Sequence, residues 1–73
     1  MRIDCLIVHS IPGRTRYRVA QKSLVRRHSE RLRAFVLGRS GAAGVRLNER
    51  CGSVIVDYDP FALSAETLAT ELA

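Results

Sequence analysis

The chain has 73 residues, 47% hydrophobic and 26% charged, which fits a single globular domain over residues 1–73 and argues against a multidomain or disordered protein. Its 12 Lys and Arg residues, of which 11 are arginine, outnumber 7 Asp and Glu and give a net charge of +5. Two distant cysteines with no Cys-x-x-Cys pair exclude a disulfide framework or zinc ribbon and favour the reducing cytoplasm.

The first predicted element is a β-hairpin. Residues 3–10 are mostly apolar and β-favouring, and the next strand covers residues 14–20. Between them, Pro12 fixes one φ angle and Gly13 accepts a positive one, which together predict a turn. The arginines of the second strand alternate with β-branched or aromatic residues and share one face, called the arginine face below: Arg14, Arg16 and Arg18.

The pairing of the two strands decides what accompanies these arginines. A two-residue turn places His9 opposite Arg16, so every second residue of the first strand lies on the arginine face: Cys5, Ile7 and His9. Leu6 and Val8 then lie on the other face, toward the core. A longer loop or a bulge would exchange the faces of the first strand.

The remaining segments continue the pattern. Residues 22–37 predict a helix that begins at an N-cap, Ser23, and ends at Gly38. Its apolar stripe contains Leu24, His28, Leu32, Phe35 and Val36. Residues 38–44 read as a loop, residues 45–48 and 53–59 as strands joined by a turn, and residues 64–73 as a helix with Ser64 as N-cap and a staple from Leu63 to Leu68.

The order ββαββα predicts an α+β fold, a ferredoxin-like open-faced sandwich in which the N-terminal strand replaces the usual last strand. The expected antiparallel sheet runs, from edge to edge, through residues 3–10, 14–20, 53–59 and 45–48. Both helices cover one face. The other face is open and carries the arginines.

The candidate metal ligands are Cys5, His9 and Cys51, together with His28 in the predicted helix. Cys5 and Cys51 fall on opposite edge strands, about 14 Å apart, and Cys5 and His9 lie about 13 Å apart along one strand. No four-ligand site within one chain is expected, so no metal or cofactor is assigned. A transition-metal site that uses Cys5 and His9 across a dimer stays open as an alternative.

Enzymatic activity is not expected. His9 and Ser10 are adjacent and so point to opposite faces of a strand. There is no carboxylate pair, and the glycines at 38, 41 and 44 follow a helix rather than a strand, the reverse of a dinucleotide-binding loop.

The arginine face is the strongest functional signal. Arg46 from a neighbouring strand and His9 are expected to join it, and Asp57 to neutralise one arginine across the sheet. Such a face fits an acidic protein surface or phosphate groups; the simpler alternative is a solvated face with weak ion pairs. Nucleic acid ranks second because only 5% of residues are aromatic and Tyr17 and Tyr58 are expected to point inward.

Three stretches also resemble a known family: Val-His-Ser-x-Pro-Gly-Arg-x-Arg-x-Arg-Val at 8–19, Gly-Val-x-x-Asn at 44–48 and Gly-Ser-Val-x-Val-x-Tyr-Asp-Pro at 52–60. They look like heavy-metal-associated-like domains without the metal-binding cysteines, which occur at the N-termini of bacterial metal-transporting P-type ATPases and in small proteins encoded beside them. The arginine motif is similar to one in proteins of bacterial iron-storage compartments (ferrosomes). The resemblance covers about residues 6–72.

The resemblance implies a ferredoxin-like fold and a docking, regulatory or metal-trafficking role in the cytoplasm, at the cytoplasmic face of a membrane if the domain belongs to or binds a transporter. Partners would be the ATPase or iron-storage proteins, with the domain a monomer or weak dimer. The metal-binding members carry Cys-x-x-Cys where this chain has Ala20-Gln21-Lys22-Ser23, so no metal ligand is carried over.

Overall fold

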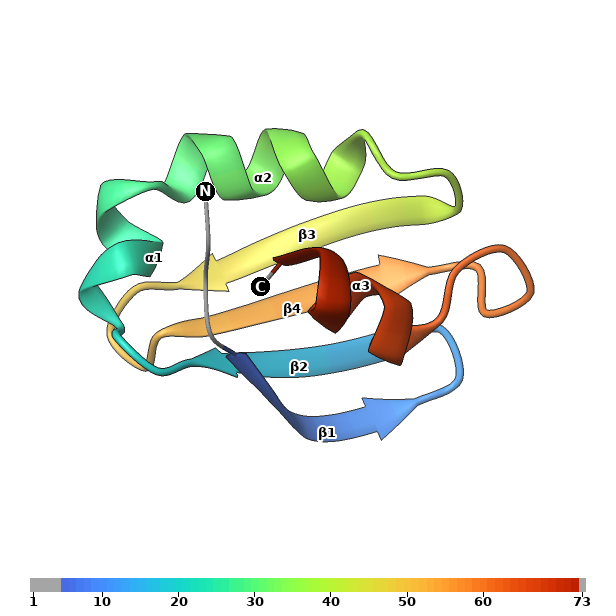
Figure 1. The fold of residues 1–73 in the computed structure, drawn as a ribbon, viewed down its shortest axis with the longest axis horizontal. Helices are drawn as coiled ribbons and strands as arrows, with labels where there is room; N and C mark the ends of the chain where they lie inside the picture. Colours follow the sequence, from blue (N-terminus) through green and yellow to red (C-terminus); the bar gives the residue numbers. More distant parts are fainter. Residues whose placement is uncertain (1–4, 73) are drawn as a thin grey trace.

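The computed structural model describes residues 5–72, and the chain forms a four-stranded antiparallel sheet with three helices, an α+β fold (Figure 1). The elements in chain order are β1 (Cys5–Ile11), β2 (Arg14–Val19), α1 (Ser23–Arg27), α2 (Ser29–Leu37), β3 (Ala42–Asn48), β4 (Ser53–Tyr58) and α3 (Ala65–Leu72). The strand order is β1-β2-β4-β3, which is the order expected from the sequence.

One hydrophobic core lies between the sheet and the helices. The inward residues of β2 and β4 are almost fully buried and form a single cluster with Val25, Leu32 and Val36 of the first two helices and Leu68 of α3. All three helices therefore cover the same face of the sheet. The opposite face has no helix over it within residues 5–72.

The predicted single helix over residues 22–37 is wrong, because it is divided at His28 into α1 and α2. His28 has φ −121° and ψ 26°, so it is the C-cap of one helix and the N-cap of the next. The N-cap of α1 is Lys22 and makes no side-chain capping bond, so the expected Ser23 cap is also wrong. The bend buries Val25, which the predicted stripe missed, and leaves Phe35 at the surface.

The second hairpin is longer than expected. The loop was expected over residues 38–44, but in the structure β3 already begins at Ala42, which pairs with Tyr58. Gly38 caps α2, but its φ of −77° is ordinary rather than left-handed. The helix that follows β4 starts as predicted, since the Ser64 side chain accepts a hydrogen bond from the Thr67 amide at 3.1 Å.

The turn of the first hairpin is confirmed, and a bulge beyond it changes the faces of β1. Gly13 has a φ of +87°, which only glycine adopts easily, and Ile11 pairs with Arg14 across the two-residue turn. The register then shifts between Ile7 and His9. Ile7 consequently pairs with Tyr17 rather than with an arginine.

The shift moves each residue of β1 on the far side of the bulge to the opposite face of the sheet. Cys5 pairs with Val19 and packs against the core, whereas Leu6 pairs with Arg18 and is 71% exposed. The placement of Cys5 and Ile7 on the arginine face, expected from an unbroken register, is therefore wrong, as is the inward placement of Leu6; the alternative of a bulge is the one that the structure has. The physical reason is that one extra residue in one strand inverts the alternation on its far side.

Candidate functional site: the arginine face

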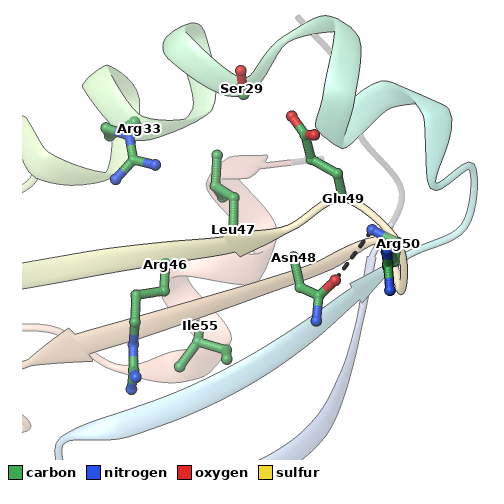
Figure 2. A pocket seen from close by; sticks show the side chains of 8 residues that line it. All are labelled: Ser29, Arg33, Arg46, Leu47, Asn48, Glu49, Arg50 and Ile55. Atoms are coloured by element: carbon green, nitrogen blue, oxygen red, sulfur yellow. Dashed lines mark hydrogen bonds between the residues drawn. The ribbon is translucent and has the colours of Figure 1, made fainter.

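The arginine face brings together residues from all four strands. Cross-strand pairing aligns one residue from each of β1, β2, β4 and β3 in a single row: His9, Arg16, Ile55 and Arg46. Figure 2 shows Arg46 and Ile55 projecting to the same side of the sheet, with Leu47 on the other. The expected convergence of His9 and Arg46 with the arginines of β2 is thus present in the register.

Two further rows flank this one. Toward the Pro12-Gly13 turn lie Ile11, Arg14, Asp57 and Gly44, and toward the other end lie Leu6, Arg18, Ser53 and Asn48. Each row contains one arginine of β2 beside an apolar residue that is exposed, as Ile11 and Leu6 are, or half-buried, as Ile55 is. The face therefore mixes cationic and apolar groups rather than carrying charge alone.

One of the arginines is neutralised. The Nε of Arg14 donates to Asp57 Oδ1 at 2.7 Å, and the two residues are direct cross-strand partners, as expected from the sequence. Among residues 5–72, Arg16, Arg18 and Arg46 form no ion pair. These three guanidinium groups keep their donors available to an external anion.

The opposite side of β2 fixes these arginines in place. Thr15, Tyr17 and Val19 are buried, in strict alternation with the exposed arginines. The Tyr17 hydroxyl donates to the Ala65 carbonyl at 2.8 Å, and the Thr15 and Tyr58 hydroxyls share a hydrogen bond of the same length. A strand anchored in this way presents its exposed side chains from a rigid base.

Burial of the Tyr17 hydroxyl has an electrostatic consequence. Loss of hydration raises the pKa of Tyr17 well above its ordinary value, and the nearby Tyr58, Cys5 and Glu66 add to the rise. The hydroxyl therefore stays protonated and keeps donating to Ala65 at physiological pH. It serves the scaffold and does not reach the arginine face.

A hollow of about 300 Å³ lies on the arginine face itself. Its lining combines cationic and aliphatic side chains: His9, Ile11, Arg14, Arg16, Arg46 and Ile55. The alternation of β4 already places Ile55, which is half-buried, on this face. Ile11 is exposed, and its place beside the arginines depends on the strand pairing at the turn.

A larger hollow, about 510 Å³, follows the outer edge of β3 (Figure 2). Its lining residues lie on two sides of the strand: Arg33 and Leu47 on the helix side, Arg46 and Ile55 on the arginine face. The hollow therefore wraps around the edge strand and does not belong to the arginine face alone. Arg33 donates to the Val45 carbonyl at 3.2 Å and so covers part of this edge.

Cys5, His9 and Cys51 do not lie together as a metal site would require. Cys5 is on the core side of β1, His9 is on the arginine face, and Cys51 is exposed in the turn between β3 and β4. Within residues 5–72 no group of three or more His, Cys, Asp or Glu side chains could hold a metal ion. The bulge therefore contradicts the expectation that Cys5 and His9 share a face.

The positions of the aromatic residues bear on whether the arginine face could bind nucleic acid. Tyr17 and Tyr58 are buried, as expected, while Phe61 is fully exposed in the loop after β4 and Phe35 lies on α2. Among the strands of residues 5–72, no Phe, Tyr or Trp points to the arginine face, and its aromatic ring is the His9 imidazole.

None of the three helices within residues 5–72 is long and apolar enough to cross a membrane. Comparisons with protein-family models, curated proteins and solved structures found no match to this chain. Membership of the heavy-metal-associated family therefore stays a prediction.

Proposed function

We propose that the protein is a non-enzymatic interaction domain that binds an acidic segment of another protein on its arginine face. The observation that carries the proposal is the row of His9, Arg16, Ile55 and Arg46, in which two unneutralised arginines flank an apolar residue. Arg18 adds a third cation in the neighbouring row. Complementary charge would set the orientation of the partner, and the apolar residue would add contact area.

The spacing of the cations favours an extended partner. Alternate residues of β2 lie about 6.6 Å apart, and an extended peptide presents its own alternate side chains at the same interval. Acidic residues at every second position of such a peptide would match Arg16 and Arg18 together. The exposed aliphatic residues beside them, Ile11 and Leu6, would contact intervening apolar groups.

The acidic segment is preferred to nucleic acid for a specific reason. A single strand of RNA or DNA gains much of its affinity by stacking bases on aromatic side chains. The arginine face offers mainly aliphatic side chains, and the His9 imidazole is its one aromatic ring among the strands of residues 5–72. Nucleic acid remains the second candidate, and it would reveal itself by oligonucleotide binding that weakens steeply with salt.

The link to metal handling rests on the sequence resemblance. On that basis we place the domain in the cytoplasm, as a variant of the ferredoxin-like fold whose first strand occupies the edge of the usual last one. Its partner would be a metal-transporting ATPase or an iron-storage protein that exposes an acidic segment. In this role Cys5 is a core residue rather than a ligand.

The test compares two double variants of equal charge. Arg16→Glu with Arg18→Glu reverses the arginine face, whereas Arg27→Glu with Arg31→Glu makes the same change on exposed helix positions. Fluorescence anisotropy would follow a labelled peptide in which Glu alternates with Val. We expect the first variant to lose at least about tenfold in affinity and the control to lose about twofold or less.

Equal losses in both variants would mean that net charge alone attracts the peptide, and the proposal would be wrong. Circular dichroism would verify that both variants keep the fold, which is expected because all four side chains are exposed. Tighter binding of an oligonucleotide than of the peptide by the unmodified protein would favour the second candidate.

A further inference from the structure

A second cationic hollow lies away from the arginine face, where α1 meets the turn between β3 and β4. Its volume is about 480 Å³, within the range typical of small-molecule sites. Six residues line it: Lys22, Ser23, Arg26, Arg27, Glu49 and Arg50. It shares no residue with the hollow of the arginine face, so the two can be tested separately.

The charges of this hollow are unbalanced. Four cationic side chains face one carboxylate, Glu49, which leaves an excess of three positive charges. Among residues 5–72 none of these five groups forms an ion pair. Lys22 and Arg26 are one helical turn apart, as are Ser23 and Arg27. The two pairs therefore lie next to each other on one side of α1.

The two walls of the hollow are held against each other. Gly52 has a φ of +67°, and a Cβ atom at this position would come within 2.5 Å of the Lys22 Cβ. The Val19 amide donates to the Gly52 carbonyl at 2.8 Å. The hollow is therefore formed before any ligand arrives, which lowers the entropic cost of binding.

The turn that carries Arg50 is also fixed from within. The Asn48 side-chain oxygen accepts hydrogen bonds from the amides of Arg50 and Cys51, at 3.1 and 3.2 Å (the first is drawn in Figure 2). This Asx-type arrangement holds the turn in one conformation. Arg50 thus projects from a defined position opposite the side chains of α1.

We propose that this hollow binds the diphosphate group of a small molecule. A diphosphate carries roughly three negative charges at neutral pH, which would balance the excess of the lining. Guanidinium groups from two sides can each donate two parallel hydrogen bonds to phosphate oxygens, and the Ser23 hydroxyl supplies a further donor. The proposal depends on these side chains and is independent of the function proposed for the arginine face.

The test is an amide NMR titration with inorganic pyrophosphate, with ionic strength held constant by sodium chloride. We expect saturable shifts at residues 22–27 and 49–52 and none at Arg16 or Arg46. Replacing two cations from opposite walls, Arg26→Ala with Arg50→Ala, should weaken binding by about tenfold. The matched control, Arg31→Ala with Arg39→Ala, removes the same charge outside the hollow and should change affinity by less than about twofold.

Shifts spread over all exposed arginines, or equal losses in both variants, would show non-specific attraction and overturn the proposal. So would tighter binding of a single-stranded oligonucleotide than of pyrophosphate at equal phosphate concentration. A nucleoside diphosphate that binds more tightly than pyrophosphate would support the proposal and add contacts beyond the phosphates. The Arg26 and Arg50 variant should still bind the acidic peptide, which separates failure here from failure of the arginine-face function.

Discussion

The ion pair between Arg14 and Asp57 gives a two-sided test of the arginine face. Asp57→Asn removes the carboxylate and releases Arg14 as an additional cation, whereas Arg14→Gln removes the cation and releases the Asp57 carboxylate. Both changes break the same 2.7 Å contact. Binding of an acidic partner should therefore respond in opposite directions to two variants with the same structural defect.

The expected changes in stability and in affinity follow from the exposure of the two side chains and from Coulomb's law. The Arg14 and Asp57 side chains are 52% and 35% exposed, so solvent screens their pair and its loss should cost at most about 1 kcal/mol of folding free energy. A unit charge about 8 Å from one partner carboxylate in water contributes about 0.5 kcal/mol, or about twofold in affinity. Two such carboxylates give about fivefold.

The assay is anisotropy of the labelled Glu-Val peptide at low salt, with urea unfolding of each variant as the control for stability. Asp57→Asn should bind about two- to fivefold more tightly than the unmodified protein, and Arg14→Gln more weakly by a similar factor. Weaker binding by both variants would show that the intact pair itself, or the local structure it holds, makes the contact. That result would refute the reasoning.

Three further predictions concern the scaffold: two test Tyr17 on the arginine strand, and one tests Gly52 beside the second cationic hollow. Tyr17→Phe removes the hydrogen bond to Ala65 and should lower the free energy of unfolding by about 1 kcal/mol, measured with urea. Because the folded pKa of Tyr17 lies above its ordinary value of 10.0, stability should fall by up to about 1.4 kcal/mol per pH unit above that pH, and Tyr17→Phe should abolish this part of the decline in alkaline urea titrations. Gly52→Ala forces a side chain into a left-handed φ and against Lys22, and a thermal melt should show a loss of about 2 kcal/mol or more; an unchanged melt would contradict the close packing at this turn.

The arginine strand could be predicted from the sequence because its information is local. Strict alternation of Arg14, Arg16 and Arg18 with Thr15, Tyr17 and Val19 fits only a half-buried strand. The Pro12-Gly13 turn and the Ser64 cap depend on equally local chemistry. The strand order could also be predicted, because the first strand can pair with the open edge of the arginine strand, and the structure has this order.

The sequence left the bulge in β1 open as an alternative but could not decide for it, because the residues there have no alternation to set the register. Leu6, Ile7 and Val8 are all apolar, so a shift by one residue exchanges similar side chains between faces at little cost. The partner strand decides the outcome: Tyr17 and Val19 must point inward, and Cys5 then faces the core. The register matters because the unbroken pairing would put Cys5 on the same face as His9.

The break at His28 has a similar cause. No Gly or Pro marks it, and the stripe from Leu24 to Val36 follows helical spacing well enough to suggest one helix. Packing overrides this pattern: Val25 and Leu32 are both fully buried, and the bend at His28 lets each helix turn its own residue inward. Such a bend follows from the shape of the core, which spacing along one segment does not contain.

The most direct measurement is an amide NMR map of the unmodified protein titrated with the acidic peptide. Binding on the arginine face predicts saturable shifts along β2, at Arg46 in β3 and at Ile55 in β4, with the amides of α2 and the diphosphate hollow unaffected. Shifts centred instead on α1 and the turn at residues 49–52, with β2 unchanged, would contradict the assignment of the arginine face as the docking surface.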